Sequence, residues 1–125
     1  MKYVALCLTI AALILVACFT TPEVSATPTL DTVQQQGQSV FKLRCAQCHA
    51  LTPDTVGIGP SLAGIATRAA DRVEGYSAQE YLETSILAPK KYLVEDFMDT
   101  MPTNFGKELT SDELTALVAY LMTLK

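Results

Sequence analysis

Two cysteines and a histidine lie within five residues of one another. The segment Cys45-Ala46-Gln47-Cys48-His49 places two thiols three positions apart and an imidazole directly after the second thiol. This C-x-x-C-H spacing is the attachment pattern of c-type haem. Two thiols so spaced near the end of a helix can each add to one vinyl group of a haem, and the adjacent imidazole is then held under the iron. The motif therefore predicts one covalent haem c, attached at Cys45 and Cys48 with His49 as an axial iron ligand.

Three other uses of this motif compete with haem attachment. A redox dithiol usually belongs to a βαβ unit, and no strand pattern flanks these cysteines. A zinc site takes four ligands, whereas only Cys45, Cys48 and His49 lie at useful spacing after the N-terminal apolar run. A disulfide across this spacing would close a small, strained loop. Haem attachment is the interpretation that the motif favours.

The second axial ligand of such a haem cannot be histidine from this chain, because His49 is the only one. After the N-terminal apolar run the chain contains Met98, Met101 and Met122. Met122 falls on an apolar helical stripe, where packing is the expected role. Met101 precedes Pro102, and a residue before proline is pushed into an extended conformation. We therefore favour Met101 as the iron ligand, with Met98 or an open site as the alternatives.

The elements that must position these residues read as helices. The pattern of a capping box, a Ser, Thr or Asp followed three residues later by Glu or Gln, occurs three times: Asp31 with Gln34, Ser77 with Glu80, and Thr110 with Glu113. Apolar residues follow each box at helical spacing, and no stretch alternates as a strand does. The sequence predicts an all-α domain with helices over 31–46, 77–88 and 110–125, a short helix from Ser61 to Ala66, and long loops at 50–60 and 89–109.

The N-terminus has the composition of an export and anchoring signal. Lys2 precedes an apolar run that ends in Leu15-Val16-Ala17-Cys18, which is similar to a bacterial lipobox. A basic residue followed by a short apolar run is typical of a secretory signal, although an uncleaved transmembrane helix is the alternative. Both place the folded part at the cell membrane, on the periplasmic or extracellular side. We expect 1–17 to be a lipoprotein signal peptide, 18–30 a flexible tether lipidated at Cys18, and 31–125 the folded domain.

Residues 31–125 resemble the class I c-type cytochromes, in a monohaem bacterial lipoprotein form. Gly37, Phe41 and Cys45 follow one another at four-residue steps, as in the first helix of that family, and Tyr120 stands where the family's last helix has an aromatic. The resemblance implies that the N- and C-terminal helices cross at Gly37. It also implies a small all-helical fold packed around one covalent haem.

Two further segments match the family's iron-binding loops. Gly59-Pro60-Ser61-Leu62 is similar to its Gly-Pro-x-Leu, in which the proline carbonyl accepts the hydrogen bond of the proximal histidine. Such a contact fixes the ring and raises its basicity, so the resemblance assigns that role to Pro60. Met101-Pro102 is similar to the segment that supplies the second ligand.

The net charge of the chain and the axial ligands expected for the haem iron exclude several classes of function. The formal net charge is −4, which makes nucleic acid an improbable partner because its binding needs a basic face. A haem with both axial positions filled has no site for a small-molecule substrate, so we expect a carrier of single electrons and not an enzyme. Its partners would be redox proteins or subunits of a membrane complex, namely a quinol-oxidising complex, an oxidase or a reaction centre. A gas sensor or peroxidase-like protein with a displaceable ligand is the alternative.

The sequence does not decide the roles of two further sets of residues near the proposed site. Three acidic residues precede Met101, namely Glu95, Asp96 and Asp99. If they are exposed, we expect a partner whose docking face is basic or neutral. Other side chains could bond the haem propionates: Tyr76, Tyr92 and Arg68.

Overall fold

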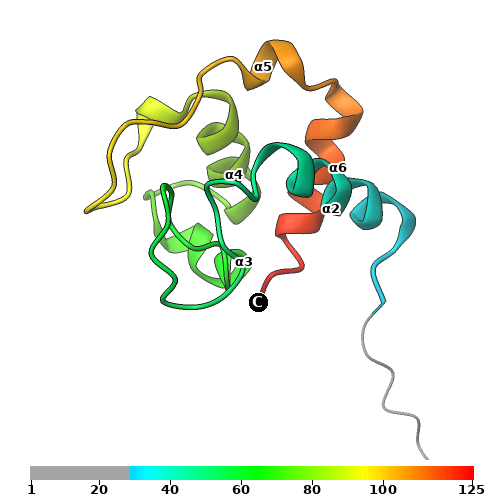
Figure 1. Ribbon diagram of the computed structural model, residues 1–125, viewed down its shortest axis with the longest axis horizontal. Coiled ribbons are helices and arrows are strands. Elements are labelled where there is room, and N and C mark those ends of the chain that lie inside the picture. Colours follow the sequence, from blue (N-terminus) through cyan, green and yellow to red (C-terminus); the bar gives the residue numbers. More distant parts are fainter. Residues whose placement is uncertain (1–28) are drawn as a thin grey trace, which may run out of the picture.

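The computed structural model describes residues 29–125, and this part of the chain is helical without strands (Figure 1). The elements follow in the order α2 (Thr32–Arg44), α3 (Ile65–Arg68), η1 (Ala69–Asp71), α4 (Ala78–Leu87), η2 (Pro89–Lys91), α5 (Phe105–Glu108) and α6 (Ser111–Leu121). The predicted all-α class is confirmed. The predicted signal peptide, Cys18 and most of the predicted tether lie outside the described residues.

Three capping boxes set where the longer helices begin. At α6, for example, the Thr110 hydroxyl accepts the N–H of Glu113, and the Glu113 carboxylate accepts the N–H of Thr110. The same reciprocal pairs begin α2 at Asp31 and α4 at Ser77. Each box satisfies two backbone donors that the first helical turn leaves unpaired. These three predicted helix starts are therefore correct. The end of the first helix differs, because α2 ends at Arg44 and passes into a turn instead of continuing to residue 46.

The expected helix start at Ser61 is wrong. The segment from 61 to 64 is not helical, and α3 begins only after Gly64, whose φ of 67° belongs to the left-handed region. The Ser61 hydroxyl donates to the Thr52 carbonyl at 2.7 Å and accepts the N–H of Ala63 at 3.2 Å. It thus holds a loop together instead of capping a helix.

The long loop expected at 89–109 contains two short helices, η2 and α5. Proline at position 89 is buried at the start of η2, and Phe105 is buried at the start of α5. Helices this short are marginal on their own, and packing supplies most of their stability. They form here because each inserts an apolar ring into the core, which local sequence patterns do not report.

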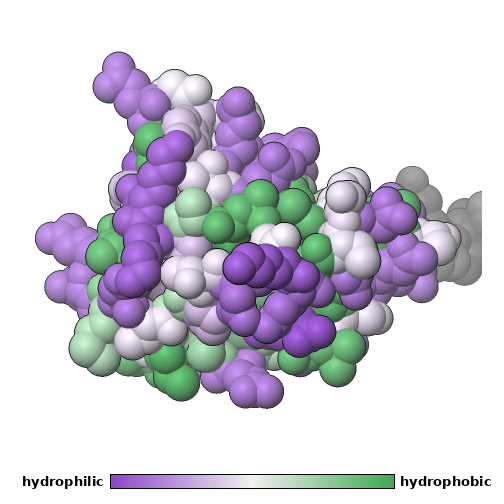
Figure 2. All heavy atoms as spheres, turned by 90° about the horizontal axis from the view of Figure 1, so that it is seen from above, coloured by the Kyte–Doolittle hydropathy of each residue, from purple (hydrophilic) through white to green (hydrophobic). Residues whose placement is uncertain are grey.

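The surface of the domain is not uniformly polar. Several large apolar side chains are exposed, the most exposed being Val56 at 92% and Met98 at 81%. On the face seen from above, hydrophobic residues gather near the centre among hydrophilic side chains (Figure 2). None of the helices in residues 29–125 is both long and apolar enough to cross a membrane.

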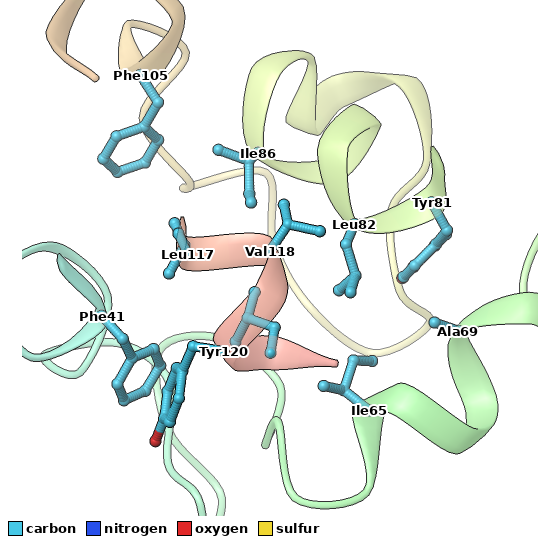
Figure 3. Packing of buried hydrophobic residues seen from close by; sticks show 11 residues of the cluster. Phe41, Ile65, Ala69, Tyr81, Leu82, Ile86, Phe105, Leu117, Val118 and Tyr120 are labelled. Atoms are coloured by element: carbon cyan, nitrogen blue, oxygen red, sulfur yellow. The ribbon is translucent and has the colours of Figure 1, made fainter. Parts of the chain in front are cut away.

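The helices α2 and α6 pack against each other more extensively than any other pair of described elements. A Cβ atom added at Gly37 would overlap the carbonyl of Ala116 and lie 2.8 Å from the Cβ of Tyr120. Beside this point the rings of Phe41 and Tyr120 pack with centroids 5.7 Å apart, at 49° to one another (Figure 3). The crossing of the terminal helices that the resemblance implied is present, and it depends on glycine at position 37.

The remaining core lies on the other side of α6. Leu117 and Val118 occupy its centre, between Phe41 on one side and Tyr81 and Ala69 on the other (Figure 3). The C-terminus returns to α3, where the N–H of Ala66 donates to the Leu124 carbonyl at 2.9 Å. One continuous apolar cluster therefore links α2, α3, α4, α5 and α6.

Substitution of Gly37 by alanine tests the close approach of α2 and α6. Alanine favours a helix interior over glycine by roughly 0.5–1 kcal/mol, but here the methyl group meets backbone that cannot move away cheaply. We expect a net loss of about 1–3 kcal/mol in the free energy of unfolding, measured by urea denaturation followed by circular dichroism. Gly106→Ala is the control, because its Cβ would meet only Leu87 at 3.5 Å. Equal stability of the two variants would contradict the assigned role of Gly37.

Candidate haem site

One cleft in the described part of the chain brings Cys45, Cys48 and His49 together with Met101, although Met101 is distant in the sequence. The empty volume of this cleft is about 1200 Å³, including the part that opens to solvent. Most of the side chains that line it are aliphatic or aromatic, and they come from α2, α4 and α6 and from the segments 58–65 and 89–105.

The turn that follows α2 positions the two thiols and the imidazole. The N–H groups of Cys48 and His49 both donate to the Cys45 carbonyl at 3.0 Å. The Cys48 carbonyl in turn accepts the N–H of Gly59 at 2.9 Å, and the Ala50 carbonyl accepts the N–H of Leu62 at 2.8 Å. The motif is therefore fixed on one side by α2 and on the other by the segment at 59–62.

The imidazole of His49 is held in one orientation. Its Nδ1 lies 2.8 Å from the Pro60 carbonyl oxygen, which can only accept a hydrogen bond. Nδ1 must therefore carry the ring proton, which leaves Nε2 with a lone pair available for a metal. The ring also lies close against the backbone at Gly59, because a Cβ there would lie 2.5 Å from Cε1 and 2.9 Å from Nδ1 of His49. The proposed roles of His49 and Pro60 stay predictions, and this geometry is what those roles require.

The two thiols are free and half-buried at the wall of the cleft. Burial and, to a lesser extent, the neighbouring Cys48 raise the pKa of the Cys45 thiol to about 11. A redox-active C-x-x-C pair depends on the opposite shift, towards a thiolate at neutral pH. Within residues 29–125, no group of three or more His, Cys, Asp and Glu side chains is arranged to hold a metal ion. The environment favours covalent attachment over the dithiol interpretation.

The methionines considered as ligands differ in their surroundings. Met101 is half-buried, packs against the core and lines the cleft. Met98 also lines the cleft, but 81% of it is exposed. Met122 packs against the core at the end of α6. Met101 is therefore the methionine whose position is best fixed beside the cleft.

The acidic segment before Met101 is exposed. Glu95 and Asp96 face solvent, whereas Asp99 pairs with Lys90 at 2.8 Å. This ion pair joins η2 to the segment just before Met101. Because Lys90 is 66% exposed, the pair adds little stability by itself. Glu95 and Asp96 form no ion pair with any residue in 29–125, so their charges are uncompensated within that part of the chain.

Only part of the polar lining was predicted. Of the three side chains considered for the haem propionates, Arg68 and Tyr92 line the cleft, while Tyr76 has the Lys91 ammonium 5.5 Å from its ring centroid. Sequence reasoning missed Arg72, which also lines the cleft. Its only signal in the sequence was a second arginine four positions after Arg68.

The residues present fit a haem c. Two free thiols, an imidazole with Nε2 available and a half-buried thioether all border one apolar cleft. Among the described residues that line it, no carboxylate is present to oppose the propionates of such a cofactor. Each of the donors that covalent haem attachment requires is therefore in place.

Comparison with known proteins agrees with this chemistry. The model of a family described as cytochrome c matches residues 34–125. A cytochrome c from Gibberella zeae is 35% identical over 104 residues, which cover 70% of this chain and 90% of that protein. A cytochrome c2 from Rhodoblastus acidophilus is 50% identical over 42 residues, covering 33% of this chain and 38% of that protein. The cytochrome c2 iso-2 of Magnetospirillum molischianum is 28% identical over 88 residues, which cover 65% of this chain and 91% of that protein.

Substitution of Gly59 by alanine tests how the imidazole is held. The added methyl group would occupy the space of the His49 ring, so we expect the ring to be displaced from Pro60 and its bond to iron to be weakened. In haem-loaded protein, the absorption spectrum should then show a substantial high-spin fraction, with the haem still covalently attached. Gly106→Ala should leave the spectrum unchanged, and an unchanged spectrum in Gly59→Ala would contradict this packing.

Proposed function

We propose that this chain, which belongs to the cytochrome c family, acts while tethered to a membrane by a lipid on Cys18. It is a class I c-type cytochrome, an electron carrier with one covalent haem. The observation that supports the electron-transfer part is that Cys45, Cys48, His49 and Met101 all line one apolar cleft in residues 29–125. Export and anchoring are supported by the basic residue, apolar run and lipobox-like segment that precede Cys18.

Five residues of the cleft have a proposed task. Cys45 and Cys48 hold the haem through thioether bonds, while Nε2 of His49 and the sulfur of Met101 bind its iron. The haem supplies a one-electron iron couple whose potential is raised by methionine ligation. Pro60 keeps the His49 ring oriented and increases its basicity by accepting the Nδ1 proton in a hydrogen bond.

With both axial positions filled, substrates and gases have no access to iron. The half-buried position of Met101 against the core supports a ligand that is not easily displaced. The alternative, a gas sensor or peroxidase-like protein, needs a ligand that leaves readily or an open site. The methionine variants below separate these functions.

Met101→Ala and Met98→Ala identify the second ligand. We expect the weak near-infrared band of methionine–iron ligation in the oxidised protein to disappear in Met101→Ala and to persist in Met98→Ala. The haem should stay attached in both variants, because the thioethers do not depend on the methionine. The reverse pattern would assign the ligand to Met98, and rapid binding of carbon monoxide to the reduced native protein would favour the sensor function.

Redox partners are proposed to dock at the mouth of the cleft. Three of the side chains that line it are exposed, namely Ile58 at 63%, Leu93 at 50% and Met98 at 81%. Exposed apolar side chains that rim a cleft are typical of an interaction surface. The uncompensated charges of Glu95 and Asp96 nearby favour a basic or neutral partner.

A lipid on Cys18 would limit how far the domain can move from the membrane surface. Residues 18–30 are rich in Thr, Pro and Ser, a composition suited to a flexible tether. Such a tether permits either a carrier that moves between partners at the membrane surface or a subunit held in a quinol-oxidising complex, an oxidase or a reaction centre. Purification from membranes together with stoichiometric partner subunits would favour the subunit.

Cys18→Ser tests the anchor directly. Without the thiol no lipid can be attached, and we expect the haem protein to move from the membrane to the soluble fraction after cell disruption. Cys7→Ser is the matched control, because Cys7 lies inside the predicted signal peptide and should leave the distribution unchanged. Retention of Cys18→Ser in washed membranes would instead indicate an uncleaved N-terminal helix.

A further inference from the structure

The part of the chain that contains Met101 is weakly attached to the rest of the domain. Pro89 is buried before it and Phe105 is buried after it, whereas none of the residues 92–103 is buried. We call residues 92–103 the methionine segment (yellow to light orange in Figure 1). Segments with few buried apolar contacts open locally at a free energy far below that of global unfolding. The position of Met101 therefore depends on the contacts that hold this segment.

The hydrogen bonds of the methionine segment are local. The N–H of Phe97 donates to the Val94 carbonyl at 3.1 Å, and the N–H of Thr100 donates to the Met98 carbonyl at 2.9 Å. Asp96, in the turn closed by the first of these bonds, has a φ of 69°, a left-handed conformation that favours glycine. Apart from one ion pair, no hydrogen bond or ion pair in residues 29–125 joins the segment to another part of the chain.

That ion pair is between Lys90 and Asp99. Its nitrogen and oxygen are 2.8 Å apart, and only 34% of the Asp99 side chain is exposed. Lys90 belongs to η2, whose first residue, Pro89, is buried, so the ammonium extends from an anchored element. Asp99 lies two residues before Met101, and two residues span at most about 7 Å. The pair therefore restrains the backbone directly beside the proposed iron ligand.

The other contacts of the methionine segment are apolar. The rings of Tyr92 and Tyr81 pack edge to face, with centroids 5.7 Å apart, at the N-terminal end of the segment. Phe97 and Met101 line the cleft. Apolar contacts are not directional, so they keep the segment near the cleft without fixing the place of one sulfur atom. The ion pair supplies a restraint at a defined point.

We propose that the ion pair between Lys90 and Asp99 positions Met101 at the cleft and thereby sets how often its thioether leaves the iron. This inference rests on the proposed function, in which Met101 binds the haem iron. A partly exposed pair contributes little to global stability, but the same contribution is a large share of the small free energy that keeps a weakly held segment closed. Lys90 and Asp99 are positioning residues, because both act through the backbone that carries Met101.

Displacement of the methionine by imidazole measures how often Met101 leaves the iron. The full chain is produced in a host that attaches haem, and the near-infrared band of the oxidised protein is first recorded for the native chain and for Met101→Ala. Imidazole affinity is then compared among the native chain, Asp99→Asn, Lys90→Gln and the double variant. Glu95→Gln is the matched control, because it removes the same charge from the same segment, at a carboxylate without an ion pair in residues 29–125.

We expect imidazole to bind about 1.5- to 5-fold more tightly to Asp99→Asn and to Lys90→Gln than to the native chain, the range that one partly exposed ion pair allows. The double variant should match the single variants, because the second substitution removes an interaction that is already lost. Glu95→Gln should keep the native affinity. The midpoint of urea unfolding should change little in all of these variants, because the pair acts on the segment and not on the core.

Two kinds of failure are distinguishable. A near-infrared band that persists in Met101→Ala would refute the ligand assignment, and the inference with it. A band that is lost in Met101→Ala, together with native imidazole affinity in both single variants, would overturn the inference alone. Additive gains in the double variant, or an equal gain in Glu95→Gln, would also overturn it, because either result would show an effect of charge without a specific pair.

Discussion

Direct backbone contact between α2 and α6 at Gly37 is the constraint on which the position of the haem-attachment motif depends. Gly37 and Phe41 are the buried residues of α2, and both lie at its contact with α6. The helix ends at Arg44, Cys45 caps it four residues beyond Phe41, and the rest of the motif follows in the next turn. A shift of the crossing would therefore move Cys45 relative to the cleft wall that α4 and α6 supply.

The second fixed point is the segment at 59–62, which supports the motif from the opposite side. Gly59 lies against the His49 ring, Pro60 accepts its proton in a hydrogen bond, and the carbonyl of Ser61 accepts from Arg68. One short stretch of backbone thereby connects the imidazole to the arginine end of the cleft. The orientation of the iron ligand and the charge beside the cofactor are properties of the same segment.

Features encoded over a few neighbouring residues could be predicted from the sequence. The capping boxes at Asp31, Ser77 and Thr110 depend on contacts between residues three apart, and the spacing of the C-x-x-C-H motif indicates haem attachment. The crossing at Gly37 could also be predicted, but only because the spacing of Gly37, Phe41 and Cys45 matches a known family.

Features that depend on packing between distant segments could not be predicted. The short helix α5 forms because Phe105 reaches the core, and its four residues have no periodicity that would reveal it. Ser61 has the pattern of a helix start, yet a hydrogen bond to Thr52 competes for its hydroxyl. Arg72 belongs to the cleft only because η1 packs against α4, a contact that no sequence pattern near it indicates.

Positive charges line the cleft and negative charges lie on the surface, so the two sets affect different properties, namely the reduction potential and the association with partners. Exposed carboxylates such as Glu95 and Asp96 are screened beyond roughly 10 Å at moderate ionic strength, so they affect partner association more than the iron. Partly buried arginines are screened less, and they act together with the apolar wall and methionine ligation. On the proposed ligation, all three disfavour the extra positive charge of oxidised haem. The reduction potential is therefore a property of the cleft, while net charge and its salt dependence govern the encounter with partners.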